Sequence, residues 1–159
     1  MPPRRVPAQA NMDSEPCCLV LDTNIVLDLI VFRDPACQAL KQALERGQVR
    51  WIATQEMRDE LARVLAYPKI LPRLATYQLT AVDVLLQFDR LIKRAAAAPR
   101  ALLRCRDADD QKFVDLALAH GASLLSKDRA VLAMKKRLGT MGVRVQTLYL
   151  DTHPAGVVD

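Results

Sequence analysis

The sequence is poor in residue types that several common functional sites require. Aromatic residues make up 4% of the 159-residue chain, too few for a nucleic-acid reader that works by stacking bases. The chain has 2 histidines, His120 and His153, so a histidine-based zinc site is nearly excluded. His120 directly precedes Gly121, where a helix is expected to end and the imidazole can cap backbone carbonyls.

The cysteines show none of the paired C-x-x-C spacings of zinc sites or thioredoxin-like motifs. They are therefore expected to be small buried apolar residues of a protein from a reducing compartment. The 4 residues concerned are Cys17, Cys18, Cys37 and Cys105.

Long apolar runs are also lacking, although 51% of the residues are hydrophobic. No stretch is long enough to cross a bilayer, and no apolar segment of a secretory signal follows Arg4 and Arg5. The sequence therefore predicts a soluble, cytoplasmic protein that does not associate with membranes. We expect a proline-rich, disordered leader over residues 1–16, one domain over 17–150 and a flexible tail over 151–159.

Basic residues exceed acidic ones. The chain has 23 Lys and Arg against 18 Asp and Glu, which gives a net charge of +5. This balance is compatible with an anionic partner such as nucleic acid, although many basic proteins bind none.

Short apolar segments of strand length alternate with segments of helical periodicity. This alternation predicts an α/β fold in which helices cover both faces of a central, mainly parallel sheet. The expected strands are 17–21, 49–53, 101–103, 122–125 and 143–148, and the expected helices are 25–32, 35–46, 54–67, 80–98, 110–120 and one through 135–137.

Two of the expected strands end in a carboxylate. Asp22 follows the first strand, and Asp128 follows the strand that ends at Leu125. Because chemistry in an open parallel sheet lies at the carboxyl ends of the strands, neighbouring positions would bring Asp22 and Asp128 to the same edge.

Helical geometry selects two further acids, since each residue turns about 100° from the last. Glu60 borders the apolar stripe of its helix, whereas Asp59 points away from it. In the helix expected over 110–120, Asp110 lies on the inward side, whereas Asp115 is expected on the solvated side.

Capping is an alternative role for three of these acids. Asp22, Asp110 and Asp128 each stand where an acidic side chain could cap a helix or favour its dipole. Glu60 lies within its helix, where a buried carboxylate without a partner is costly.

Carboxylates gathered without histidine favour a hard cation, Mg²⁺ or Mn²⁺, over zinc. Such an ion can orient or deprotonate water for attack on a phosphodiester, so hydrolysis of nucleic acid is the expected chemistry. Basic side chains beside Asp110 and Asp128 could hold a phosphate backbone or be solvated loop ends; they are Arg104, Arg106, Lys127 and Arg129.

Taken together, these segments resemble the PIN domain family. The resemblance spans roughly residues 18–150, and within the family it is narrower to the branch described as toxin components of bacterial toxin-antitoxin systems. The motifs that carry it, in chain order, are Leu19-Val20-Leu21-Asp22-Thr23-Asn24, Glu60-Leu61-Ala62-Arg63-Val64-Leu65, Cys105-Arg106-Asp107-Ala108-Asp109-Asp110-Gln111-Lys112-Phe113 and Ser126-Lys127-Asp128.

The resemblance implies a three-layer α/β/α fold and a Mg²⁺- or Mn²⁺-dependent ribonuclease. By position, its catalytic and metal-binding acids would be Asp22, Glu60, Asp110 and Asp128. Asn24 and Ser126 would orient the carboxylates, Ser126 standing where the family more often has Thr. Asp107 or Asp109 could share the role of Asp110, because both lie within a turn of it.

The leading hypothesis is therefore an endonuclease of single-stranded RNA, restrained by a small antitoxin protein. A catalytically silent PIN-fold module that binds RNA or protein is the alternative. A third interpretation makes Asp22 a phosphotransfer nucleophile, but the related phosphatases have a second Asp where this chain has Asn24. A homodimer is also compatible with apolar positions on the helix from Thr80.

Overall fold

The computed structural model describes residues 16–149. Its centre is a five-stranded sheet in the order β3-β2-β1-β4-β5, with every neighbouring pair parallel. The strands are β1 (Cys17–Leu21), β2 (Val49–Ala53), β3 (Ile92–Arg94), β4 (Ser123–Leu125) and β5 (Val145–Gln146). The sheet is flanked by helices, which confirms the predicted three-layer α/β/α fold.

Strand β1 occupies the middle of the sheet. It pairs with β2 on one side, Leu19 beside Trp51, and with β4 on the other, Leu21 beside Leu125. The chain therefore leaves β1 in one direction for β2 and β3 and later returns on its other side for β4 and β5. In parallel sheets the point where the strand order reverses is the usual place for ligands, at the carboxyl ends of the strands.

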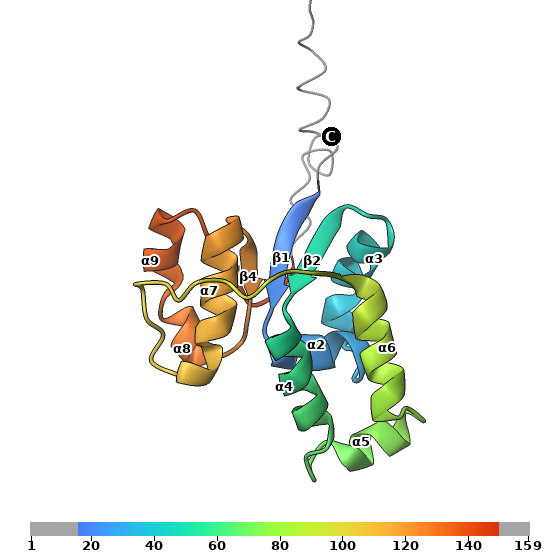
Figure 1. The fold of residues 1–159 in the computed structure, drawn as a ribbon. Helices are drawn as coiled ribbons and strands as arrows, with labels where there is room; N and C mark the ends of the chain where they lie inside the picture. The colour runs from blue at the N-terminus through green and yellow to red at the C-terminus, as the bar shows by residue number, and fades with distance from the viewer. Residues whose placement is uncertain (1–15, 150–159) are drawn as a thin grey trace, which may run out of the picture.

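The helices form two groups on either side of β1 (Figure 1). The first group, called here the α2–α6 lobe, follows β1 and β2 in the chain, and the second, the α7–α9 lobe, follows β3. The α2–α6 lobe has α2 (Thr23–Ile30), η2 (Pro35–Cys37), α3 (Gln38–Glu45), α4 (Gln55–Leu65), α5 (Leu71–Thr76) and α6 (Ala81–Leu91). The α7–α9 lobe has η3 (Ala108–Asp110), α7 (Gln111–His120), α8 (Arg129–Leu132) and α9 (Lys135–Thr140).

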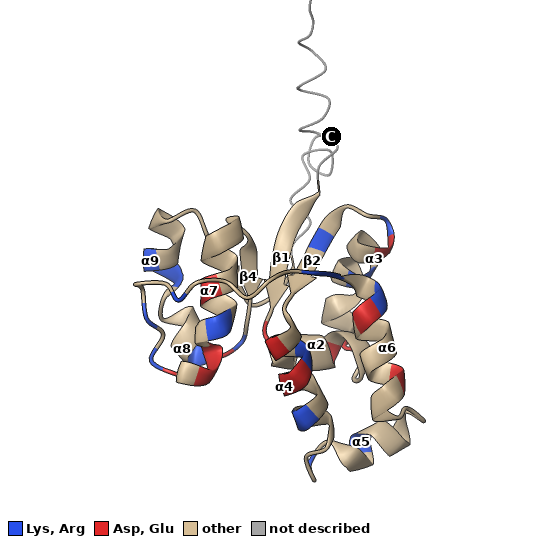
Figure 2. Ribbon diagram, viewed as in Figure 1, with Lys and Arg blue, Asp and Glu red and all other residues tan. Residues whose placement is uncertain are grey.

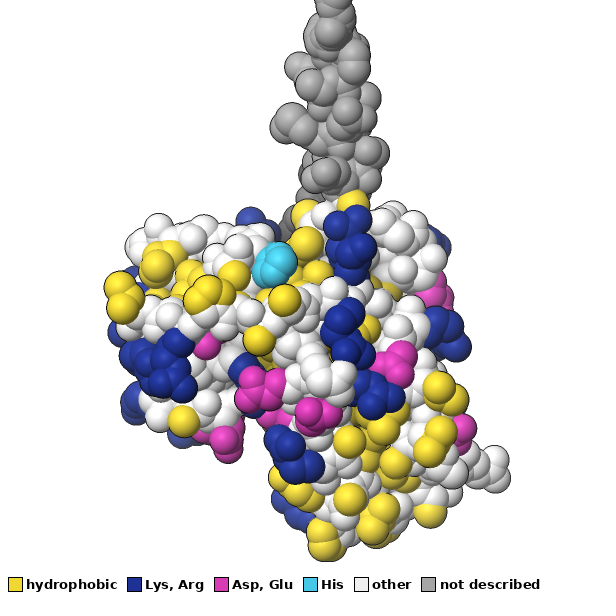
Figure 3. Space-filling model, in the orientation of Figure 1, with side chains coloured by type: hydrophobic (Ala, Val, Ile, Leu, Met, Phe, Trp, Pro, Cys, Tyr) yellow, Lys and Arg dark blue, Asp and Glu magenta, His cyan; other side chains and the backbone are white. Residues whose placement is uncertain are grey.

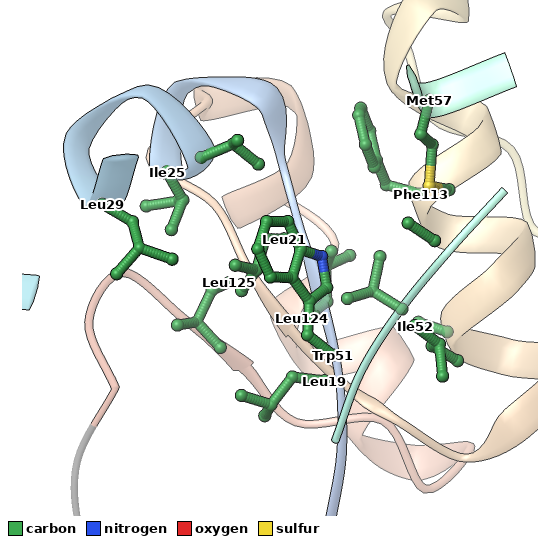
Figure 4. Packing of buried hydrophobic residues seen from close by; sticks show 14 of the residues in the cluster. Leu19, Leu21, Ile25, Leu29, Trp51, Ile52, Met57, Phe113, Leu124 and Leu125 are labelled. Carbon is green, nitrogen blue, oxygen red and sulfur yellow. The ribbon is translucent and has the colours of Figure 1, made fainter. Parts of the chain in front are cut away.

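One hydrophobic core joins the sheet to both lobes. Figure 4 shows side chains from β1, β2 and β4 meeting Met57 of α4 and Phe113 of α7. The ring of Trp51 stands edge-on to Phe88 of α6, with centroids 5.1 Å apart and planes at 89°. Because all these elements share one core, the positions of the strand ends are fixed from both sides.

The helix predicted over residues 80–98 is wrong beyond Leu91. Helix α6 ends there, and Ile92–Arg94 forms the edge strand β3, paired with β2. The alanines of 95–98 favour a helix by intrinsic propensity, but pairing with an existing strand overrides that weak preference. Residues 101–103, predicted as a strand, form none, and the edge position is taken by β3 instead.

Asp115 was expected on the solvated side of its helix, and this too is wrong. Its Oδ1 is partly buried and accepts hydrogen bonds from the backbone N–H of Ala101, at 2.9 Å, and from Nε2 of Gln111, at 2.8 Å. Gln111 also accepts from the backbone N–H of Cys105, at 2.6 Å. These bonds attach the connecting segment to α7, so the outer face of that helix is covered by its own preceding loop.

The remaining expectations concern the cysteines, the chain ends and membranes. All four cysteines are free; Cys37 and Cys105 are buried as predicted, whereas Cys17 is exposed because it begins β1 at the rim of the core. The predicted leader, apart from Pro16, and the predicted tail lie outside the described residues. Within residues 16–149 no helix has both the length and the apolar character needed to cross a membrane.

Candidate metal centre

Three carboxylates converge at the carboxyl ends of β1 and β4. Asp22, Asp110 and Asp128 each offer one oxygen, and these oxygens lie within 4.8 Å of one another. Asp22 directly follows β1, Asp110 ends η3 before α7, and Asp128 precedes α8. Strand pairing between β1 and β4 brings together acids that are far apart in the sequence.

Only one of the three acids makes a helix-capping hydrogen bond through its side chain. Oδ1 of Asp128 accepts a hydrogen bond from the backbone N–H of Ala130, at 2.8 Å, and so caps α8. Asp22 and Asp110 stand at the cap positions of α2 and α7, but neither side chain makes a capping hydrogen bond. A capping hydrogen bond therefore does not account for Asp22 or Asp110.

Ser126 holds two of the acids in place. Its hydroxyl donates to Oδ2 of Asp22, at 2.6 Å, and accepts from the backbone N–H of Asp128, at 3.0 Å. The side chain is fully buried, directly after β4. This geometry agrees with the expectation that Ser126 orients carboxylates. Hydrogen bonds of this kind, from residues behind the ligands, typically set ligand orientation in metal sites.

The cluster is electrostatically unfavourable without a cation. Burial raises the pKa of Asp110 to about 8, helped by the negative charges of Asp22 and Asp128. Burial also raises the pKa of Asp22, against the hydrogen bond from Ser126 and the nearby backbone N–H of Asn24, which lower it. Like charges in a partly dehydrated site disfavour ionisation, so a bound cation would stabilise the three acids in their ionised form.

Asp110 carries the clearest sign of a missing partner. Its side chain is buried, and its Oδ2 makes no hydrogen bond to any residue among those described. Buried carboxylate oxygens are normally satisfied, since leaving one unpaired is costly. An all-oxygen donor set with an unpaired oxygen fits a hard divalent cation, which Asp22, Asp110 and Asp128 would hold.

Glu60, the fourth predicted acid, lies beside this cluster and not within it. Its Oε2 accepts a hydrogen bond from the hydroxyl of Thr23, at 2.6 Å, and its Oε1 forms an ion pair with Nζ of Lys112. The neighbouring Asp22 still senses its charge, which adds to the rise in the pKa of Asp22. Glu60 therefore already has a cation and a donor within the protein.

Other predicted residues take different positions. The side chain of Asn24 is exposed, and Lys127 forms an ion pair with Asp28 that ties β4 to α2. Arg104, Arg106 and Arg129 are exposed. Asp107 and Asp109 are exposed as well, and the carboxylate of Asp107 accepts from the backbone N–H of Asp109, at 2.9 Å. Of the three clustered aspartates in this loop, the structure brings only Asp110 to the centre.

Sequence reasoning missed Thr23 and Lys112 as partners of Glu60. Thr23 follows Asp22 directly, and Lys112 follows the third acid by two residues, so both lay inside the quoted motifs. Nothing in the one-dimensional pattern shows that α4 approaches the start of α2 and the start of α7 at the same point. The contact depends on the packing of the two lobes.

A parallel α/β sheet with carboxylates meeting at the reversal of strand order defines a class of α/β domain with a candidate metal site at the strand ends. Within that class, the family model described as PIN domain matches residues 18–130, so the chain belongs to the PIN domain family. No curated protein matches the chain. PIN domains are generally metal-dependent nucleases, and the acidic cluster is a candidate metal site of that kind.

Proposed function

We propose that this protein is a Mg²⁺- or Mn²⁺-dependent endoribonuclease that hydrolyses phosphodiester bonds of single-stranded RNA. The observation that carries the proposal is the convergence of Asp22, Asp110 and Asp128, with one buried oxygen of Asp110 unpaired. A divalent ion bound there would activate water and stabilise charge on the phosphorus oxygens and the leaving group.

The chain's own side chains hold this centre in order. The hydroxyl of Ser126 donates one hydrogen bond to the carboxylate of Asp22 and accepts another from the backbone N–H of Asp128. Thr23 and Lys112 hold the carboxylate of Glu60 next to the centre, with its charge balanced. A centre held by packed and hydrogen-bonded neighbours needs little rearrangement when substrate arrives.

The distribution of charge supports a polyanionic substrate. Residues 99–149 carry ten Lys and Arg against five Asp and Glu, whereas residues 16–98 carry eleven against nine. The excess positive charge therefore lies in the α7–α9 lobe, where Arg104, Arg106 and Arg129 are exposed. Figure 2 shows Lys and Arg positions at several places along the ribbon of that lobe. Lys and Arg near a cleavage site attract and hold a phosphate backbone.

The test is cleavage of end-labelled single-stranded RNA by purified protein with Mg²⁺, Mn²⁺ or EDTA, with single-stranded DNA and duplex RNA alongside. We expect the metals to support internal cleavage of the single-stranded RNA, and EDTA or Asp22→Asn to abolish it. RNA left intact under all conditions, or cleavage unchanged in Asp22→Asn, would refute the nuclease. RNA binding without metal binding in a calorimetric titration would identify the catalytically silent module instead.

We further propose that this nuclease acts in the cytoplasm as the toxin of a toxin-antitoxin pair. The support is the resemblance of its motifs to that branch of the family. Expression of the chain alone should arrest bacterial growth, Asp22→Asn should not, and co-expression of a small partner from the neighbouring reading frame should restore growth. Normal growth during verified expression of active nuclease would contradict the toxin role. Size-exclusion chromatography with light scattering then decides between a monomer and a homodimer.

A further inference from the structure

A cleft between the two lobes adjoins the candidate metal centre. It has a volume of about 380 Å³ and runs between α4 on one wall and the η3–α7 segment on the other. We call it the α4–α7 cleft; its charged and aromatic lining includes Glu56, Arg63, Tyr67, Arg100 and Asp109, together with the Glu60–Lys112 pair. Figure 3 shows the surface hollowed between the lobes, with acidic and basic side chains gathered around the hollow.

Two of the residues that line the cleft connect it to the centre. Glu60 lines it and accepts the hydrogen bond from Thr23, the neighbour of Asp22. Asp109 lines it and directly precedes Asp110. The cleft therefore offers a place for a neighbouring unit of a polymer whose phosphate lies at the three carboxylates.

Some of the charges in the cleft are already balanced within the protein. Glu60 is paired with Lys112, and Asp115 accepts hydrogen bonds from Ala101 and Gln111. The side chains of Arg63, Arg100, Glu56 and Asp109 have no ion pair or hydrogen bond to any other residue in the described part of the chain. The cleft therefore presents two free guanidinium groups and two free carboxylates to a ligand.

An aromatic ring completes this set. Tyr67 lies in the turn after α4, and 51% of its surface is exposed although it lines the cleft. A ligand that uses all three features carries an anionic group, a planar face and hydrogen-bond donors. A nucleotide has all of these: Arg binds phosphate through paired N–H groups, aromatic rings stack on bases, and carboxylates accept from base amino groups.

A basic peptide is the other ligand that free carboxylates could attract. Arg63 and Arg100 would repel such a peptide. The ring of Tyr67 would contribute less to binding it than to binding a base. A cleft of this volume is also in the range, about 300–1,000 Å³, that small ligands of nucleotide size occupy in proteins. The mixed lining therefore favours a nucleotide over a basic side chain.

We propose that the α4–α7 cleft binds one nucleotide of the RNA next to the scissile phosphate and selects its base. Arg63 and Arg100 hold the phosphate, Tyr67 stacks on the base, and Glu56 and Asp109 accept from its Watson–Crick edge. Guanine fits best, because its adjacent N1–H and N2–H₂ donors match the two oxygens of one carboxylate, and uracil, without an amino group, fits worst. This inference rests on the proposed ribonuclease function and gives it a substrate preference.

The first test is the sequence preference of cleavage. RNA of random sequence is digested briefly with Mn²⁺, and the bases on both sides of each cut are counted by sequencing. We expect guanine to exceed uracil by roughly tenfold at one position adjoining the cut, the discrimination of a good paired base contact. Glu56→Gln with Asp109→Asn should abolish this preference while cleavage continues. The matched control, Glu45→Gln on the exposed face of α3, should preserve it.

The second test measures binding without cleavage. Fluorescein-labelled oligouridylate, with or without a single guanosine, is titrated with protein in EDTA and followed by anisotropy. We expect the guanosine to tighten binding severalfold, and Tyr67→Ala or Arg63→Ala to remove most of that gain. The control Arg90→Ala, an equally exposed arginine on α6, should leave it intact.

The two tests separate this inference from the proposed function. Cleavage without base preference, or with a preference that the cleft variants leave unchanged, overturns the nucleotide subsite while the ribonuclease stands. Absence of cleavage refutes the ribonuclease, and the anisotropy titration then decides about the cleft by itself. Equal binding of both oligonucleotides, or tighter binding of an arginine-rich peptide at the same residues, overturns the subsite.

Discussion

Acidic side chains at two adjoining places in this molecule have opposite electrostatic surroundings. Asp22, Asp110 and Asp128 form no salt bridge with a basic side chain in residues 16–149, and the pKa of Asp110 rises to about 8 because burial and two neighbouring negative charges oppose its ionisation. Glu60, a short way along the same edge, has an ion pair with Lys112 and a hydroxyl donor in Thr23. Of the two places, the first is therefore the one where an external cation would stabilise the ionised acids.

The comparison also changes the role expected of Glu60. The sequence placed it among four equivalent acids, whereas the structure gives it partners of its own. Because Lys112 belongs to α7 and Glu60 to α4, their ion pair joins the two lobes on either side of the centre. We therefore expect Glu60 to support the centre and the adjoining cleft more than to bind the ion.

The largest effect is expected when one of the three clustered acids, Asp22, Asp110 and Asp128, loses its charge. Asp110→Asn should lower RNA cleavage by roughly a thousandfold, since metal-ion catalysis contributes several kcal/mol and about 1.4 kcal/mol is a factor of ten. The measurement is kcat/KM for single-stranded RNA with saturating Mn²⁺. Asp59→Asn is the matched control, because Asp59 is exposed on α4 and accepts a hydrogen bond from Gln55. Equal losses in the two variants would contradict the assignment.

The next test removes the Ser126 hydroxyl, which bonds the Asp22 carboxylate and the backbone N–H of Asp128. Ser126→Ala should weaken Mn²⁺ binding or cleavage by roughly 10–100-fold, the usual cost of losing a residue that positions metal ligands. Ser126→Thr keeps the hydroxyl and should retain most of the affinity, as measured by isothermal titration calorimetry. If Thr is no better than Ala at this position while both variants remain folded, the hydrogen bond to Asp22 is not what matters.

Stability without metal should depend on pH because of Asp110. Its folded pKa of about 8 lies above the ordinary value of 3.8, so the folded state keeps a proton that the unfolded chain has lost between these values. The stability that this proton contributes is present below pH 4 and is lost as pH rises towards 8. The raised pKa of Asp22 acts in the same direction.

We therefore expect the metal-free protein to lose at least about 1 kcal/mol between pH 5 and pH 8, or roughly 2–4 °C in Tm. Asp110→Asn should lose less over the same range, and saturating Mg²⁺ should reduce the loss in the unaltered protein. Thermal unfolding in EDTA at a series of pH values measures all three. Identical pH profiles for the protein and for Asp110→Asn would rule out this carboxyl as the source.

Among these variants, the smallest effect on metal affinity is expected for substitution of Glu60, whose charge is balanced by Lys112. Glu60→Gln should change the Kd for Mn²⁺ by no more than about tenfold, the lower limit for residues around the ligands. Lys112→Met should act mainly on stability, costing about 1–2 kcal/mol, because it leaves the half-buried Glu60 without its ammonium partner. Calorimetry and denaturant unfolding measure the two quantities. A loss of metal affinity in Glu60→Gln as large as that in Asp110→Asn would make Glu60 a fourth ligand.

The sequence predicted those parts of the candidate metal centre that depend on strand ends and helix faces. Asp22 and Asp128 follow apolar strands directly, so their place at one edge needed only that β1 and β4 be neighbours. Asp110 was selected over Asp115 by its side of the helix, and it is the acid that the structure buries. The same reasoning did not foresee that Asp115 would be covered by the loop before its own helix.

Errors arose where long-range pairing decided the outcome. The alanines after Arg94 extend a helical pattern, but the preceding residues Ile92–Arg94 add an edge strand to β2. Helical periodicity also placed Glu60 correctly beside the core without indicating Lys112, which comes from the other lobe. Such contacts depend on how lobes pack, and a single sequence read segment by segment does not contain that information.

The central place of β1 has a consequence for the protein during its own synthesis. A ribosome that has released the first hundred residues has produced Asp22 and Glu60 but neither Asp110 nor Asp128. Only when β4 emerges and joins β1 do the three carboxylates meet. As the proposed ribonuclease, a nascent chain would thus be unable to cleave the messenger being translated until β4 had been made.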